Sequence, residues 1–198
     1  MKFAIGDEID TALTTAMSHE MLLCEESFER FAAIAKLNIV GRQDKRTRVA
    51  MYSAYTRFLH HLYEFYLACY QREYMSLDKI PTATIDKLLN GEGRKLLKNR
   101  RDAIDGGYAP AWENNRSVYE VEVPEEFSLQ WRRIRNRTAH VSTKRSTSKP
   151  DICLVDFYKR FHSFVYLLYY SAMAHWAVHD LNAVSWKEIE EFNLAVEA

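Results

Sequence analysis

Apolar residues recur every three or four positions over long stretches of the chain, and short polar connections separate these stretches. This period is typical of amphipathic helices, because residues three and four apart lie on one face of a helix. The pattern predicts long helices over residues 7–38 and 44–75, with Asp10 or Thr11 as the N-cap of the first. Gly41 follows the first helix, and a glycine commonly ends a helix in this way.

A third helix is expected over residues 85–104, interrupted by the Gly-Glu-Gly sequence at 91–93 and ended by the glycine pair at 106–107. Residues 108–123 have the composition of a loop, and the alternation at 118–123 predicts a short extended piece. We therefore expect a loop-rich insertion around residues 106–123.

The helix predicted over residues 125–141 organises the rest of the chain. Pro124 fits the first helical turn, where its missing N–H costs nothing. The apolar residues that follow are spaced by four and three positions and share one face, which we expect to be the core face: Phe127, Trp131, Ile134, Thr138 and Val141.

The last long helix, over residues 150–181, has aromatic side chains on most of its faces. This predicts burial on several sides, either as the central helix of a bundle or at a dimer face. A short acidic helix over residues 186–198 follows, and it would screen a basic surface of this chain or of a partner.

Composition agrees with a helical fold. The chain has 198 residues, of which 47% are hydrophobic, with only 6 glycines and 4 prolines. These values favour one globular domain over residues 1–198, all-α, built as an antiparallel bundle of about five helices. No apolar run is long enough for a membrane span, so we expect no membrane partner.

Charge and cysteine content limit how the chain could contact nucleic acid and in which compartment it works. Lys plus Arg equals Asp plus Glu at 27 each, so contact with nucleic acid would need a local basic patch rather than bulk charge. The three cysteines form no CxxC pair and no signal-peptide pattern opens the chain, which indicates a reducing cytoplasm.

A local basic patch lies on the helix predicted over residues 125–141. On a helical wheel, a polar and basic face opposes the core face, with Arg135 and Arg137 at its flanks: Arg132, Arg133, Asn136 and His140. Ser128 and Leu129 occupy the positions four residues before Arg132 and Arg133, so no acid on the same helix balances these charges. The face is suited to an anion.

The segment Arg135-Asn136-Arg137-Thr138-Ala139-His140 resembles the signature of the HEPN superfamily of all-helical ribonucleases. In that signature an arginine and an adjacent polar residue, often asparagine, precede a histidine by a short gap. The resemblance implies a HEPN-like bundle, a homodimer with a composite active site, and metal-independent RNA cleavage that leaves a 2′,3′-cyclic phosphate. It also implies a toxin-antitoxin or phage-defence setting, with a protein antitoxin or regulator as a partner.

The chemistry of these residues fits RNA cleavage without a metal or cofactor. Arg135 offers a permanently charged planar group for two phosphate oxygens, and His140 exchanges a proton near neutral pH. Asn136 lies one turn before His140 and can bind the imidazole or a phosphate oxygen. We expect Arg135, Asn136 and His140 to be catalytic, and two copies would supply both a base and an acid.

Two residues after His140 the chain has Ser142. HEPN toxins that are paired with nucleotidyltransferase antitoxins often have a tyrosine at this position. An antitoxin that modifies such a tyrosine is therefore not expected.

Other residues are candidates for binding RNA or supporting the motif. Arg132, Arg133 and Arg137 would bind RNA together with Lys144 and Arg145 of the polar loop after His140, although such a loop can be a simple connection.

The helix over residues 44–75 carries a polar strip that includes His61 and Glu64. Either residue would orient His140 in a shared cleft, or the strip lies on the surface.

Two alternatives stay open. His175 and His179 have the i,i+4 spacing of two metal ligands, but no third ligand is evident, and ordinary surface histidines fit as well. A catalytically inactive HEPN-like module that binds RNA, a nucleotide or a protein through the same basic face would also explain the chain.

Overall fold

The computed structural model describes residues 1–39, 41, 44–113, 115–139, 153–178, 180, 182, 184, 185 and 187–197. These residues form six α-helices and one 3-10 helix, η1, in the order α1 (Glu8–Ile39), α2 (Lys45–Glu73), α3 (Thr82–Asp105), η1 (Arg116–Tyr119), α4 (Phe127–Ala139), α5 (Leu154–Trp176) and α6 (Lys187–Glu197). Lys2 and Ser76 form an isolated β-bridge, and the described part of the chain contains no strand. The predicted all-α class is confirmed.

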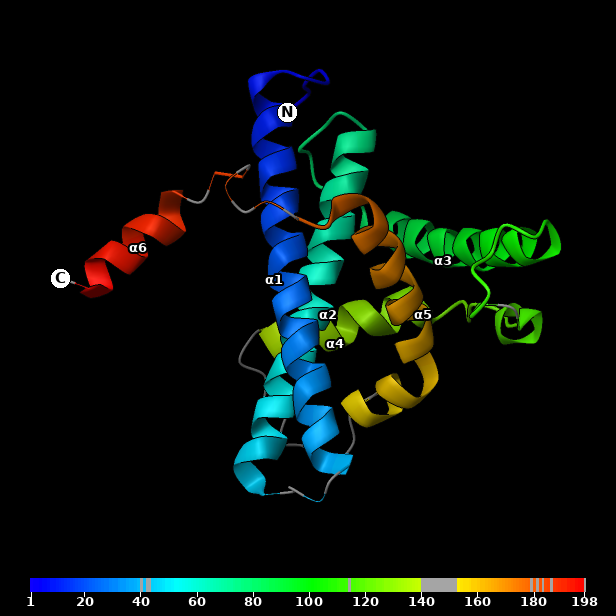
Figure 1. Ribbon diagram of the computed structural model, residues 1–198. Helices are drawn as coiled ribbons and strands as arrows, with labels where there is room; N and C mark the ends of the chain where they lie inside the picture. Colours follow the sequence, from blue (N-terminus) through cyan, green and yellow to red (C-terminus); the bar gives the residue numbers. More distant parts are fainter. Residues whose placement is uncertain are drawn as a thin grey trace.

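α1 and α2 run antiparallel along most of their length, α4 crosses α2, and α5 packs against α1 (Figure 1). α3 contacts both α4 and α5 and extends to one side, where η1 lies against it. α6 stands apart from these helices in Figure 1. Within the described residues, no helix combines the length and apolar character that crossing a bilayer requires.

The core face predicted for α4 is buried as expected. Phe127, Trp131 and Ile134 have no exposed surface, and the Trp131 indole N–H donates to the carbonyl oxygen of Leu59 on α2 at 3.0 Å. Thr138 is half-buried, and Val141 lies outside the described residues. α4 is therefore fixed against α2 by a buried aromatic side chain whose single donor is satisfied.

α5 is buried on several sides, as its aromatic content predicted. It packs against α1, α3 and α4, and its buried side chains include Phe157, Phe161 and Leu168. Tyr158, Tyr166 and Tyr170 remain partly exposed along one edge.

The predicted interruption of the third helix is wrong, because α3 continues through Gly91 and Gly93. A Cβ at Gly93 would lie 3.2 Å from Cγ2 of Val123, so the glycine permits the close approach of the segment after η1. The glycine pair does end the helix: Gly106 is the C-cap and Gly107 has a φ of +73°. The extended piece expected over residues 118–123 is absent, since η1 occupies its first positions.

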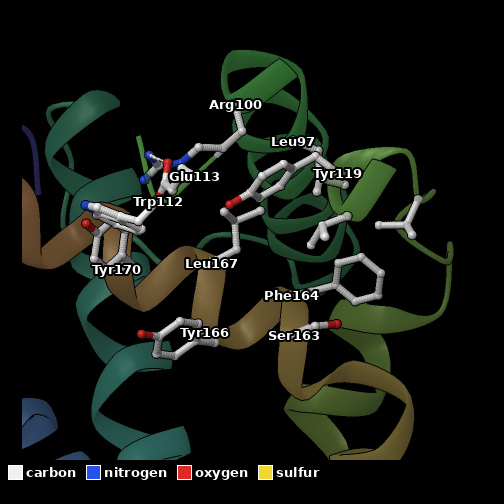
Figure 2. A pocket seen from close by; sticks show the side chains of 12 residues that line it. Leu97, Arg100, Trp112, Glu113, Tyr119, Ser163, Phe164, Tyr166, Leu167 and Tyr170 are labelled. Atoms are coloured by element: carbon white, nitrogen blue, oxygen red, sulfur yellow. Dashed lines mark hydrogen bonds and ion pairs between the residues drawn. The ribbon is translucent and has the colours of Figure 1, made fainter. Parts of the chain in front are cut away.

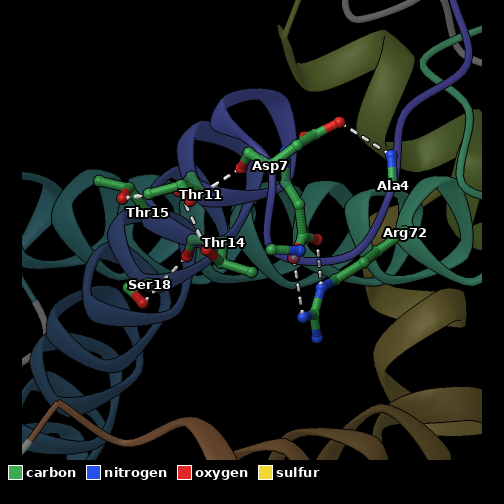
Figure 3. A network of polar contacts seen from close by, with 9 residues as sticks. Ala4, Asp7, Thr11, Thr14, Thr15, Ser18 and Arg72 are labelled. Carbon is green, nitrogen blue, oxygen red and sulfur yellow. Dashed lines mark hydrogen bonds and ion pairs between the residues drawn. The ribbon is translucent and has the colours of Figure 1, made fainter.

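The N-terminus of α1 differs from the prediction, which placed the cap at Asp10 or Thr11. Asp7 is the capping residue, because its Oδ1 accepts from the N–H of Asp10 at 2.8 Å and its Oδ2 accepts from the N–H of Ala4 at 2.8 Å. Asp10 instead accepts from Arg72 near the end of α2, at 2.7 Å to Nε and 3.2 Å to Nη2. Figure 3 shows this network, which ties the first turn of α1 to the last turn of α2.

The Asp10–Arg72 pair makes stability depend on pH in a defined direction. Arg72 lowers the pKa of Asp10 below its ordinary value of 3.8 by hydrogen bonding to the carboxylate. The folded state then binds protons less readily than the unfolded state, so this contribution is present above about pH 4 and disappears as the pH falls through the lower, folded-state pKa.

We predict that Asp10→Asn lowers the melting temperature by a few degrees at pH 7, and that the difference from the wild type shrinks between pH 4 and pH 2. Thermal unfolding followed by circular dichroism measures both values. A difference that is constant over this pH range would contradict the assignment of the ionised pair.

Candidate functional site

Arg135 lies where α4 crosses α2, and three neighbours define its position. Its Nη2 pairs with the carboxylate of Glu64, and its Nη1 donates to Oδ1 of Asn136 at 2.7 Å. The guanidinium carbon lies 5.4 Å from the centre of the Tyr63 ring, a cation-π distance. With 22% of its side chain exposed, Arg135 is held in one orientation rather than extended into solvent.

One donor of Arg135 is left over. The Nε atom is buried and has no hydrogen-bond partner among the described residues. Burial lowers the pKa of Arg135 below its ordinary value, while the nearby charge of Glu20 opposes that shift. Because an arginine remains charged at any ordinary pH, the site holds a cation, one of whose N–H groups is unpaired within the described ranges.

The polar strip predicted on the second helix faces this site. Glu64 pairs with Arg135, so the structure brings one predicted supporting residue to the motif. His61, one turn earlier on α2, places Nδ1 2.9 Å from Oε2 of Glu20 on α1, and its side chain is 18% exposed. His61 and Glu64 are thus partly buried between helices rather than on an open surface strip.

Arg132 has a different position. Its Nε and Nη2 bond both oxygens of Asp86 on α3, at 3.1 and 2.7 Å, and the Ser128 hydroxyl donates to the Asp86 carbonyl oxygen at 2.9 Å. Asn90 joins the same helices: its Nδ2 donates to the Glu125 carbonyl oxygen at 2.6 Å. Arg132 therefore anchors α4 to α3, and its predicted role in RNA binding would require competition with Asp86.

The other residues predicted for catalysis, RNA binding or metal binding are exposed, are partly exposed or lie outside the described residues. Arg133 and Asn136 are exposed and Arg137 is partly exposed at the surface of α4. His140, Lys144 and Arg145 lie outside the described residues, as does His179. Among the side chains that the structure does describe, no group of three His, Cys, Asp or Glu residues gathers as a metal site would require.

Sequence reasoning missed four residues that shape this region: Glu20, Tyr63, Asp86 and Asn90. Glu20, Tyr63 and Asp86 each meet a side chain of another helix, and Asn90 bonds the backbone of Glu125 and Ser128. No pattern along a single helix signals such contacts. Asp86 and Asn90 have the only local hint, since their i,i+4 spacing puts two short polar side chains on one side of α3.

No family model, curated protein or solved structure matches this chain. The features of the chain that bear on its function are therefore the motif, the helical fold and the geometry around Arg135.

The Arg135–Glu64 pair can be tested by its effect on stability. Glu64→Gln leaves a largely buried guanidinium without its counter-ion, and we expect the free energy of unfolding to fall by about 1–2 kcal/mol. This is less than the ~3–5 kcal/mol typical of fully buried pairs, because both side chains keep contact with water. Urea unfolding followed by circular dichroism gives the value.

Glu73→Gln is the matched control, because Glu73 is an exposed glutamate on the last turn of the same helix. Its free energy of unfolding should change by less than about 0.5 kcal/mol. Equal effects of the two substitutions would show that Glu64 contributes nothing to holding Arg135.

Proposed function

We propose that the protein is a metal-independent endoribonuclease of the HEPN type, with Arg135, Asn136 and His140 as its catalytic residues. The observation that carries this proposal is the environment of Arg135. Its guanidinium is oriented by Glu64, Asn136 and Tyr63, and it lies five residues before His140 in the chain. Its buried Nε has no partner among the described residues.

In the proposed reaction, the 2′-hydroxyl of RNA attacks its own adjacent phosphate. His140 accepts the proton of that hydroxyl, and Arg135 stabilises the negative charge that develops on the phosphate oxygens. The bond from phosphorus to the 5′-oxygen of the next nucleotide breaks, which leaves a 2′,3′-cyclic phosphate. That departing oxygen needs a proton, and His140 of a second copy would donate it.

This chemistry favours a homodimer in which two motifs share one cleft, because each chain supplies one such histidine. Arg132, Arg133, Arg137, Lys144 and Arg145 would then bind the RNA backbone around the cleft. A toxin-antitoxin or phage-defence role in the cytoplasm, with a protein antitoxin or regulator, completes the proposal. The free thiols of Cys24, Cys69 and Cys153 are compatible with a reducing compartment.

A second candidate is a catalytically inactive helical module that binds RNA, a nucleotide or a protein through the same face. Two ion pairs favour it, because Glu64 and Asp86 neutralise Arg135 and Arg132. RNA binding that weakens steeply with salt, in the absence of turnover, would distinguish this module from the enzyme.

The decisive experiment incubates purified protein with total tRNA and a single-stranded RNA in excess EDTA. We expect the wild type to cleave both and to leave cyclic phosphate ends. His140→Ala should lower the rate by about 100-fold or more, since a positioned acid or base contributes roughly 10²–10⁴-fold. Gel analysis and end-group mapping measure the rate and the product.

His175→Ala is the control, because His175 is an exposed histidine on α5 and belongs to the alternative metal pair. It should cleave like the wild type. Wild-type protein that folds and dimerises but cleaves neither RNA would overturn the enzymatic proposal, and cleavage abolished by EDTA would overturn its metal independence.

A further inference from the structure

A pocket of about 410 Å³ opens between α3, η1 and α5, where it shares no lining residue with the site around Arg135. Its volume is within the ~300–1,000 Å³ typical of small-molecule sites. Aromatic side chains dominate the walls, and Figure 2 shows Trp112 beside Tyr170, with Tyr119 across from them and Leu167 at the base. The pocket therefore presents flat apolar surfaces from three separate segments of the chain.

A carboxylate is buried in these apolar surroundings. Glu113 is only 9% exposed, and its Oε2 accepts from Nη1 of Arg100 at 2.7 Å. The Arg100 guanidinium lies 5.1 Å from the centre of the Tyr170 ring, so both members of the ion pair are held at the pocket. An ionised carboxylate in an apolar cavity is costly, and one bond to Arg100 leaves acceptor capacity on its oxygens for a ligand donor.

Tyr119 adds a group that donates. Figure 2 shows its hydroxyl directed toward the middle of the pocket, on the side of Glu113 and Leu167. Burial, together with the charge of Glu113, raises the pKa of Tyr119 above 10, so its hydroxyl keeps its proton at neutral pH. The ligand thus meets a carboxylate that accepts and a phenol that donates, both between aromatic faces.

We infer that this pocket binds a guanine base. A planar base would stack on the rings of Trp112 and Tyr170, as bases do on aromatic side chains of other proteins. Guanine presents two adjacent N–H donors, N1 and the N2 amino group, that suit a carboxylate such as Glu113. Its neighbouring O6 oxygen accepts a hydrogen bond, which suits the Tyr119 hydroxyl. Adenine and the pyrimidines lack this combination of two donors beside an acceptor.

The pocket and the ribonuclease proposal are independent, because binding of a free nucleoside requires no cleavage and no residue of α4. Isothermal titration calorimetry with guanosine directly tests whether the pocket binds a guanine base. We expect saturable binding below about 1 mM guanosine, with a similar affinity for guanosine monophosphate. Inosine, which lacks the N2 amino group, should bind about 10-fold to 100-fold more weakly, the effect of losing a hydrogen bond to a charged group.

Three variants separate base recognition from structure. Trp112→Ala alters a side chain that is 70% exposed at the rim, and it should weaken guanosine binding about 10-fold without affecting the fold. Glu113→Gln should weaken it about 10-fold to 100-fold. Glu122→Gln, an exposed glutamate of the same insertion outside the pocket, should stay within about 2-fold of the wild type.

Absence of guanosine binding by the wild type would overturn the inference. Equal affinities for guanosine, adenosine and cytidine would do so as well, because the base would not be recognised. If Glu113→Gln fails to fold, the inosine comparison and Trp112→Ala still decide the question in proteins whose core is intact.

Discussion

The burial of Trp131 is the constraint on which the rest of the structure depends. Its ring has no exposed surface, packs against Tyr63 and Phe127, and donates its only N–H to the Leu59 carbonyl oxygen. An indole placed this way fixes the rotation of α4 about its own axis as well as its distance from α2. Because Arg135 follows Trp131 by one helical turn, the same contact determines where the guanidinium points.

A second set of contacts fixes the direction of α4. Asn90 and Asp86 on α3 bind the first turn and Arg132, so the helix is held at its N-terminal end by α3 and along its length by α2. The Ser128 N–H donates to Oδ1 of Asn90, and the Ser128 hydroxyl donates to the carbonyl oxygen of Asp86. Side chains that orient a functional group are most precise when rigid elements carry them, and Arg135 meets that condition.

The sequence predicted the helical class, the core face of α4 and the end of α3 at its glycine pair, because periodicity and glycine conformation are local properties. It failed at Gly93, where the reason for glycine is Val123, 30 positions along the chain. The candidate site shows the same difference between local features and contacts between distant segments. Arg135 and Asn136 are visible as a motif, whereas the partnership of Arg135 with Glu64, and of Arg132 with Asp86, depends on how helices cross.

The two ion pairs of α4 differ in a way that bears on function. Arg132 and Asp86 form an ion pair with two hydrogen bonds, one to each carboxylate oxygen. Its role in holding α4 to α3 is enough to explain this pair. Arg135 has a carboxylate partner, but within the part of the chain that the structure describes its buried Nε has no acceptor. Apolar side chains would often replace a purely structural buried pair without loss of stability, and an unsatisfied buried donor lowers stability further. Anchoring alone therefore accounts for Arg132, whereas anchoring does not explain why the buried Nε of Arg135 has no acceptor among the described residues.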